Sequence, residues 1–206
     1  MKLAAVASLS ALLVAGCGGA VQQATIVAPN AQNASARVEA TGQRWALVPQ
    51  RSRVDVVGVD VVGGKHPVTF ERWRGHVTIG PPNRLLVEVE MESAHGESEW
   101  ITHILKSELL EAERFPMATF QGTIDEKGLV EVNAKIHGVE RGLRFHGALK
   151  REGNEYHFVA KFKISRDAFA IHSQASWDGL VKDDVHIYLD VRAREERVTV
   201  EEKAER

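Results

Sequence analysis

Several side chains in this sequence could catalyse a reaction or bind a metal, but their spacing does not assemble a site. The nine histidines include His137 and His172, and His172 is followed by Ser173 and later by Asp178. A zinc site takes three or four ligands with short local spacing, and no H-x-H or H-x-x-x-H pair occurs. The G-x-S-x-G motif of a serine nucleophile is also missing. We therefore expect no metal, no cofactor and no enzymatic activity, with an enzyme acting on a lipid or using a histidine-bound metal as the last alternative.

Two arginines are candidates for binding a polar head group. Arg114 begins the segment Arg114-Phe115-Pro116, and Arg166 follows an apolar alternating stretch. For both arginines and their neighbours we favour a structural role over head-group binding. Pro116 would end a helix, with Phe115 and Phe120 anchoring it to the domain. Arg166 would pair with Asp167, Asp183 or Asp184. His137 precedes a glycine turn, and we expect it to be solvated.

Cys17 is the single cysteine, and its chemistry is predicted to be lipid attachment. Lys2, the apolar run from Leu3 to Val14 and the small residues Ala15-Gly16 precede it. A run of this length is too short to span a bilayer, so residues 1–16 are predicted to be a signal peptide. The pattern resembles the lipobox of bacterial lipoproteins, in which the thiol takes a diacylglycerol. We expect a chain anchored to a membrane of the bacterial cell envelope, facing the periplasm, with the outer membrane favoured.

The remaining boundaries follow from composition. Residues 17–43 lack aromatics and any period, and they are predicted to be a flexible tether. Residues 44–195 form the predicted domain, and residues 196–206 a charged tail. With its cysteine acylated, the domain has no disulfide and depends on its core. A formal net charge of −2 does not indicate the basic surface that nucleic-acid binding requires. We also count a second copy of the chain, forming a homodimer, among the candidate partners.

Apolar residues alternate with polar ones through most of the domain, which predicts antiparallel strands with one buried face. Leu85, Val87 and Val89 alternate with Glu88 and Glu90, and similar runs cover residues 130–137, 156–164 and 185–192. Glycine-rich turns separate the runs, as in an all-β barrel or sandwich of roughly eight strands. Residues 97–111 instead follow a helical period, and we expect a helix there, packed against the barrel.

The inward-facing positions are the candidate binding surface. A small closed barrel is either filled by its side chains or holds one ligand. Small residues at inward positions would leave space or would fit the taper of the barrel, and both readings stay open for Gly58, Ala134, Gly147 and Ala160. The candidate lining residues are Val56, Phe70, Val87, Val89, Phe120, Ala134, Ile136, Leu143, Phe145, Phe158, Ala160, Phe162, Phe169, Ile187 and Leu189.

Six short stretches, in order, resemble the YceI-like polyisoprenoid-binding family. They are F-x-x-x-x-G-x-V from Phe70, Leu105 to Leu110, Arg114 to Phe120, Ile136 to Leu143, Arg166 to Ile171 and Lys182 to Ile187. The departures are Leu109-Leu110 where aromatics are usual, Gly142 where proline is usual, and the hairpin from Gly63 to Pro67.

The resemblance implies an all-β fold, an extended antiparallel eight-stranded lipocalin-like β-barrel with one flanking α-helix. It also implies an elongated apolar cavity for an isoprenoid tail, such as that of a quinone or a polyprenyl phosphate, bound as a ligand rather than a cofactor. We therefore expect a lipid-binding or lipid-carrying protein. The alternative is a barrel with a filled core that serves a structural, stress-related or interaction role.

Overall fold

The computed structural model describes residues 21–31, 42–175 and 177–196. The predicted signal peptide, Cys17 and residues 197–206 of the predicted charged tail lie outside the described residues. None of the helices within the described ranges is long and apolar enough to cross a membrane.

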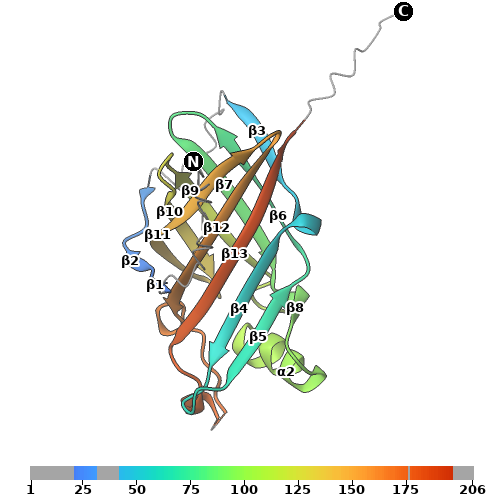
Figure 1. Ribbon diagram of the computed structural model, residues 1–206. Helices are drawn as coiled ribbons and strands as arrows, with labels where there is room; N and C mark the ends of the chain where they lie inside the picture. Colours follow the sequence, from blue (N-terminus) through green and yellow to red (C-terminus); the bar gives the residue numbers. More distant parts are fainter. Residues whose placement is uncertain (1–20, 32–41, 176, 197–206) are drawn as a thin grey trace, which may run out of the picture.

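Eight antiparallel strands close into a barrel (Figure 1). Around the wall the order is β12, β11, β10, β9, β7, β6, β3 and β13, and β13 pairs with β12 to close the ring. The expectation of an all-β eight-stranded barrel is confirmed. The bounds are β3 (Gln43–Leu47), β6 (Trp73–Ile79), β7 (Asn83–Glu90), β9 (Met117–Ile124), β10 (Leu129–Ile136), β11 (Val139–Glu152), β12 (Glu155–Ser165) and β13 (Asp184–Glu195).

A further sheet segment extends one side of the barrel. The edge of β13 pairs with β3 at Ala193–Glu195 and with β4 (Arg53–Val59) along His186–Asp190. The short 3-10 helix η1 (Pro49–Arg51) separates β3 from β4. β4 continues into β5 (Lys65–Phe70), which pairs with β8 (Ala94–His95). The β4–β5 turn and the loop between β12 and β13 therefore lie at one end of the barrel, together with the helix (Figure 1).

The helix forms close to where its period predicts it. α2 (Glu99–Ile104) begins after Ser98, whose hydroxyl accepts a hydrogen bond from the Ile101 amide at 3.2 Å. It continues as one π-helical turn, η3 (Leu105–Leu109). Ile104 is buried, whereas Trp100, four residues earlier along the helix, is 66% exposed. The helix ends before Pro116, and Glu111 adopts a left-handed φ of 42° in the turn that follows.

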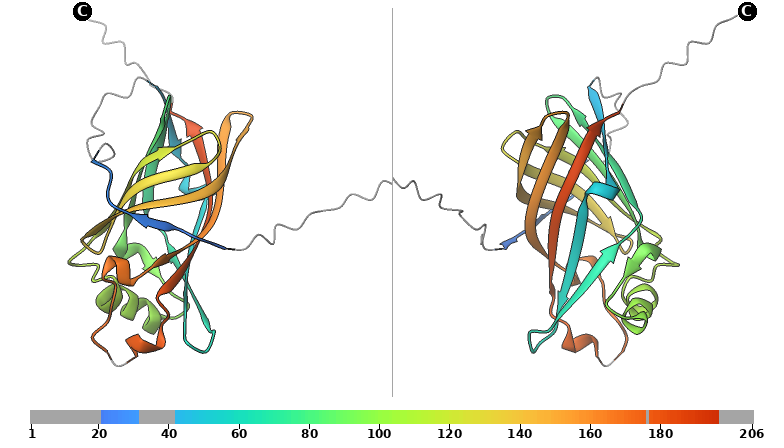
Figure 2. Two further views of the ribbon diagram at one scale, coloured as in Figure 1. Left: turned by 90° about the vertical axis from the view of Figure 1, so that its left-hand side faces the viewer. Right: turned by 45° about the vertical axis from the view of Figure 1, so that its right-hand side comes forward.

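The tether prediction is wrong for residues 22–27. β1 (Gln22–Gln23) pairs in parallel with β12, and β2 (Thr25–Val27) pairs antiparallel with β11. These two strands, blue in Figure 2, lie against the barrel wall. Ala24 between them is 3% exposed and belongs to the core.

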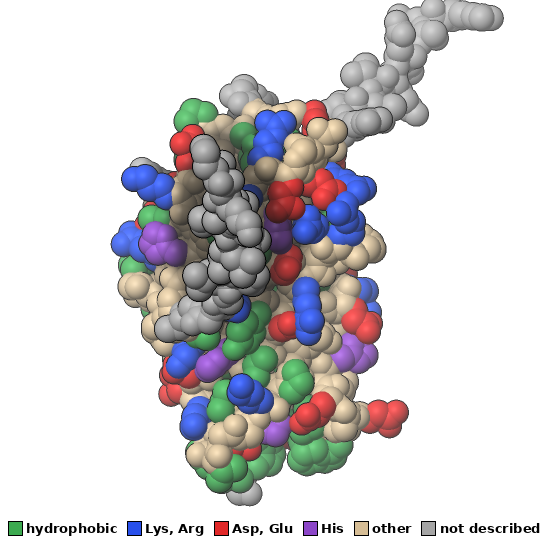
Figure 3. Space-filling model, in the orientation of Figure 1, with side chains coloured by type: hydrophobic (Ala, Val, Ile, Leu, Met, Phe, Trp, Pro, Cys, Tyr) green, Lys and Arg blue, Asp and Glu red, His purple; other side chains and the backbone are tan. Residues whose placement is uncertain are grey.

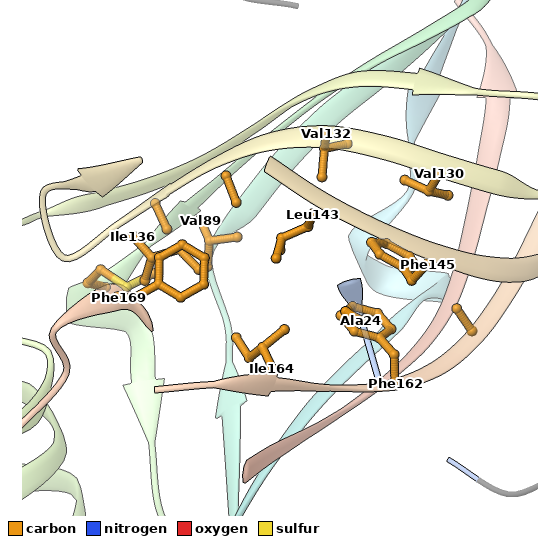
Figure 4. Close-up of a cluster of buried hydrophobic side chains, with 14 of the residues drawn as sticks. Ala24, Val89, Val130, Val132, Ile136, Leu143, Phe145, Phe162, Ile164 and Phe169 are labelled. Carbon is orange, nitrogen blue, oxygen red and sulfur yellow. The ribbon is translucent and has the colours of Figure 1, made fainter. Parts of the chain in front are cut away.

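The core lies inside the barrel, and its members come mainly from β9 to β12 (Figure 4). Burial follows the predicted alternation, because Val130, Val132 and Ala134 are buried while their neighbour Glu131 is not. Asn133 breaks the rule: it lies on the outward phase and is still only 6% exposed. The remaining 3-10 helices are η2 (Met91–Ser93), η4 (Asp167–Phe169) and η5 (Asp178–Leu180).

Candidate functional site

The barrel interior is packed on the side formed by β9 to β12. Phe145 and Phe162 stack with ring centroids 3.9 Å apart at an interplanar angle of 15°. Phe169 from η4 is fully buried at the end of this cluster (Figure 4). Eight of the predicted lining residues are buried in this core, with Val89 coming from β7 and Phe169 from η4: Val89, Ala134, Ile136, Leu143, Phe145, Ala160, Phe162 and Phe169.

The opposite side of the interior is less completely buried. Apolar side chains from β5, β6, β7 and β13 pack against the core cluster but keep part of their surface accessible. These half-buried side chains are apolar, so an apolar molecule that covers them would remove them from water favourably, at about 25 cal/mol per Å². Val56 on β4 is half-buried opposite Ile187 but does not belong to the group that packs against the core. The other predicted lining residues do belong to it, with Phe120 and Phe158 at its margins: Phe70, Val87, Phe120, Phe158, Ile187 and Leu189. Their contact with a ligand stays a prediction.

Most of the small inward residues do not leave space. A Cβ at Gly147 would lie 2.2 Å from Cζ of Phe158, so the phenyl ring fills that position. Ala134 and Ala160 are 0% and 4% exposed. Gly58 differs, because a Cβ there would meet only the His66 carbonyl oxygen, at 3.9 Å. Space is therefore left beside Gly58, whereas Ala134, Gly147 and Ala160 fit closely against their neighbours.

At the helix end of the barrel, Arg166 fastens the loop between β12 and β13. Its guanidinium donates to Asp178 Oδ1 at 2.6 Å and to the carbonyl oxygens of Ile171, Asp178 and Val181 at 3.0–3.2 Å. Only 8% of its side chain is exposed. The predicted partners Asp167, Asp183 and Asp184 are wrong; Asp183 instead accepts from Ser165 and the Asp167 amide.

This pair also sets the charge state of its carboxylate. The hydrogen bond from Arg166 lowers the pKa of Asp178, with a further contribution from the Ser173 amide, while burial opposes the shift. Nη1 and Nη2 of the guanidinium are committed to one carboxylate and three carbonyls, and Nε is buried without a partner among the described residues, so no donor is exposed to a head group. The structural role is therefore the one that the geometry supports for Arg166.

Arg114 lies at the same end but on the surface. Its side chain is 72% exposed, pairs with Glu111 at 3.1 Å and lies over the Phe115 ring at 4.8 Å. Phe115 packs against His137, with ring centroids 4.4 Å apart. The side chain of His137 is 8% exposed, so the expectation of a solvated histidine is wrong. Its Nε2 lies 3.2 Å from Glu111 Oε1, without the alignment of a hydrogen bond.

The residues with catalytic potential are not arranged for catalysis. The hydroxyl of Ser173 donates to Glu108 at 2.9 Å, and Asp178 is held by Arg166. His172 lies 3.6 Å from Asp167 and from Asp178. Among the residues that the structure describes, no group of three or more His, Cys, Asp and Glu side chains could hold a metal ion.

A second aromatic cluster lies toward the other end of the barrel. Trp45 from β3 is 1% exposed and meets Tyr156 edge to face at 4.7 Å. Arg151 lies 5.9 Å from both rings. Aromatic and cationic side chains thus cover this end, as Phe169 and the Arg166 loop cover the helix end.

The outer surface offers two pockets of different character. One, of about 270 Å³, is lined by the ion pairs Arg72–Glu90 and Arg74–Glu88, which neutralise each other. The other, of about 380 Å³, lies where residues 27–30 cross β10 and β11. Elsewhere, exposed apolar side chains gather at the helix end (Figure 3), where Val62 is 90% and Leu180 56% exposed.

Sequence reasoning missed three functional positions. Asp178 was considered only beside His172 and Ser173 as a catalytic candidate, although it is the counterion of Arg166. Gln22 and Asn133 hold the N-terminal segment, as described below. A buried amide on the outward phase of a strand requires a covering segment, and that covering is visible only in three dimensions.

The sequence and the fold of this chain resemble those of known proteins. Residues 45–193 match the family described as YceI-like domain. Similar solved structures are BcnA of Burkholderia cenocepacia (TM-score 0.63, 18% identity, covering 71% of this chain and 98% of that one) and a polyisoprenoid binding domain from Saccharophagus degradans (0.62, 13%, 74% and 98%). A Campylobacter jejuni YCEI protein also matches (0.53, 20%, 63% and 85%). At these identities the likeness concerns the fold. Among curated proteins no sequence matches.

Proposed function

Since this chain belongs to the family of YceI-like domains, we propose that its barrel binds and carries a long apolar lipid of the polyisoprenoid or quinone type. The observation that carries the proposal is the half-buried apolar face of β5, β6, β7 and β13. Accessible apolar surface inside a closed barrel is what an apolar tail would cover. The structural neighbour from Saccharophagus degradans, described as a polyisoprenoid binding domain, supports the ligand class.

The function proposed is binding rather than catalysis. Ser173, His172 and Asp178 are committed to other contacts, and the interior is lined by hydrocarbon. A ligand held only by dispersion and by its removal from water would be recognised by length and girth. We further propose that acylated Cys17 anchors the barrel to a membrane of the cell envelope, where such lipids reside.

The test of binding uses residues 17–206 with Cys17→Ser, expressed in bacteria and purified without detergent. Native mass spectrometry and lipid extraction should find a stoichiometric quinone or polyprenyl species. A protein that is free of lipid, and that also fails to take up added polyprenol, would contradict the proposal. That result would favour a filled-core scaffold, an alternative supported by the full burial of Ala134 and Leu143.

The anchor needs its own test. The full chain should fractionate with membranes, and Cys17→Ser should release it or leave it with an uncleaved signal. Labelling with a radioactive fatty acid distinguishes the two. Wild-type protein that takes up no label would contradict the anchor and leave the binding proposal untouched.

A further inference from the structure

The wall of the barrel has a gap that the chain fills with its own N-terminal segment. β11 and β12 pair directly only from Gly147 with Ala160 to Glu152 with Glu155. Toward the helix end the two strands are not paired with each other. Residues 22–30, here called the docked segment, lie there instead, with β1 on β12 and β2 on β11 (Figure 2).

Side-chain amides hold both ends of the docked segment. Gln22 uses its amide as a short stretch of backbone: its Nε2 donates to the His146 carbonyl, and its Oε1 accepts from the His146 amide at 3.1 Å. Asn133 does the same for Asn30, accepting from its amide at 2.9 Å and donating to its carbonyl at 3.0 Å. The two clamps explain the burial of Asn133 on the outer face of β10.

The docked segment covers the packed core directly. Ala24 points inward and lies among Leu143, Phe145, Phe162 and Ile164 (Figure 4). Its amide donates to the Lys163 carbonyl at 2.9 Å. Removing the segment would therefore open the wall onto apolar side chains of the interior, between two strand edges that it now pairs.

This part of the wall is joined by short ladders. β1 has two paired residues and β2 three, whereas β12 and β13 pair from Glu155 to Ser165 without a break. Trp45 and Phe169, toward the two ends of the barrel, are buried, at 1% and 0% exposed. Short ladders at the end of a chain open at lower free energy than continuous ones in the core.

We propose that the docked segment is a displaceable part of the barrel wall, and that an apolar ligand passes laterally into the interior through the gap that it fills between β11 and β12. The proposal rests on the lipid-binding function above. It makes residues 22–30 a gate, held by the amides of Gln22 and Asn133, that opens along the side of the barrel rather than at either end.

One pair of cysteines would lock the gate. Thr25 and Arg144 are directly opposite on β2 and β11, and both are on the outward phase. Opposed residues of an antiparallel pair lie about 4.5–5.5 Å apart at Cα, within the range of a disulfide. In a chain carrying Cys17→Ser, T25C/R144C would hold the only two cysteines.

A substitution at Gly142 should instead loosen the docked segment. A Cβ there would lie 2.6 Å from Cγ2 of Val27 and 2.7 Å from the Ala28 carbonyl oxygen, so Gly142→Ala should weaken docking from outside the barrel. Gly179→Ala is the matched control, because nothing lies within 4 Å of a Cβ at that position.

The experiment measures stopped-flow uptake of dansyl-labelled farnesol by residues 17–206. The oxidised T25C/R144C form should take up the probe at least tenfold more slowly than the same protein after reduction, with equal binding at equilibrium. Gly142→Ala should accelerate uptake several-fold, and Gly179→Ala should not change it. Equal rates for the oxidised and reduced forms, with normal equilibrium binding, would overturn the gate alone. Absence of binding at equilibrium in every form would instead overturn the proposed function, and the gate with it.

Discussion

Replacing Asp178 by alanine tests whether Arg166 is a structural clasp. The change leaves a guanidinium that is 92% buried without its counterion, since only 8% of the side chain is exposed. Breaking a fully buried pair costs about 3–5 kcal/mol. Three carbonyl oxygens still accept from Arg166, and Asp178 is itself 18% exposed. We therefore expect a loss of about 3 kcal/mol, at the lower end of that range.

Urea unfolding followed by circular dichroism measures this loss. With a slope of about 2 kcal/mol per M, the midpoint should fall by roughly 1.5 M. Asp167→Ala is the matched control, because its carboxylate is 59% exposed and does not contact Arg166; the change should stay within about 0.5 kcal/mol. Equal effects of the two substitutions, or a loss of lipid binding without a loss of stability, would refute the clasp and restore a head-group role.

The same pair predicts a pH dependence. The pKa of Asp178 is lowered in the folded state, chiefly by the Arg166 hydrogen bond. The unfolded state binds the proton more readily, so the contribution is present above the unfolded pKa, about 3.9, and is lost as the pH falls through the lower folded value. Between pH 5 and pH 2 the wild type should lose more stability than Asp178→Ala.

Three further changes test packing and charge. Ala160→Phe should destabilise by about 1–3 kcal/mol or prevent folding, because the site is only 4% exposed; a normal melting temperature would mean that the packed side has room. Gly147→Ala should also lower the melting temperature, since its methyl group would meet the Phe158 ring. His66 has a raised pKa, mainly through its hydrogen bond to Glu97, with burial opposing. Its contribution is thus present below pH ~6.5 and lost as the pH rises through the folded value. His66→Gln should cost under ~1 kcal/mol at pH 5.5 and less at pH 8.5, because the side chain is 38% exposed; thermal melts at both pH values would detect a reversed order.

The wall of the barrel was predictable because its signal is local. Period-two alternation places Val130, Val132 and Ala134 on one face whatever the neighbouring strand is. The helix was predictable for the same reason, from a period of 3.6 and the Ser98 cap. Its final π-helical turn, Leu105–Leu109, has no comparable signature in the residue types.

The misses all involve partners distant in sequence. Gln22-Gln23 reads as tether by composition and becomes a strand only because the gap beside β12 offers unpaired backbone groups. The role of a small residue also depends on what faces it across the strand. Gly147 lies opposite Ala160 and under the ring of Phe158. Its lack of a side chain therefore makes room for that ring and leaves no empty space.

An open interior is therefore best tested at Gly58, where no side chain fills the position of a Cβ. It lies on β4 two residues from Val56, on the same face, with open space where its side chain would be. Gly58→Ala should stabilise the domain by about 0.5–1 kcal/mol, because glycine in a strand loses more entropy on folding. Gly58→Leu should keep the stability within about 1 kcal/mol of wild type while lowering the amount of lipid bound at equilibrium, since the added side chain occupies the half-filled side. A Gly58→Leu protein that unfolds far more easily would mean that β4 faces a filled core. One that is stable and binds lipid fully would exclude this part of the interior from the binding surface.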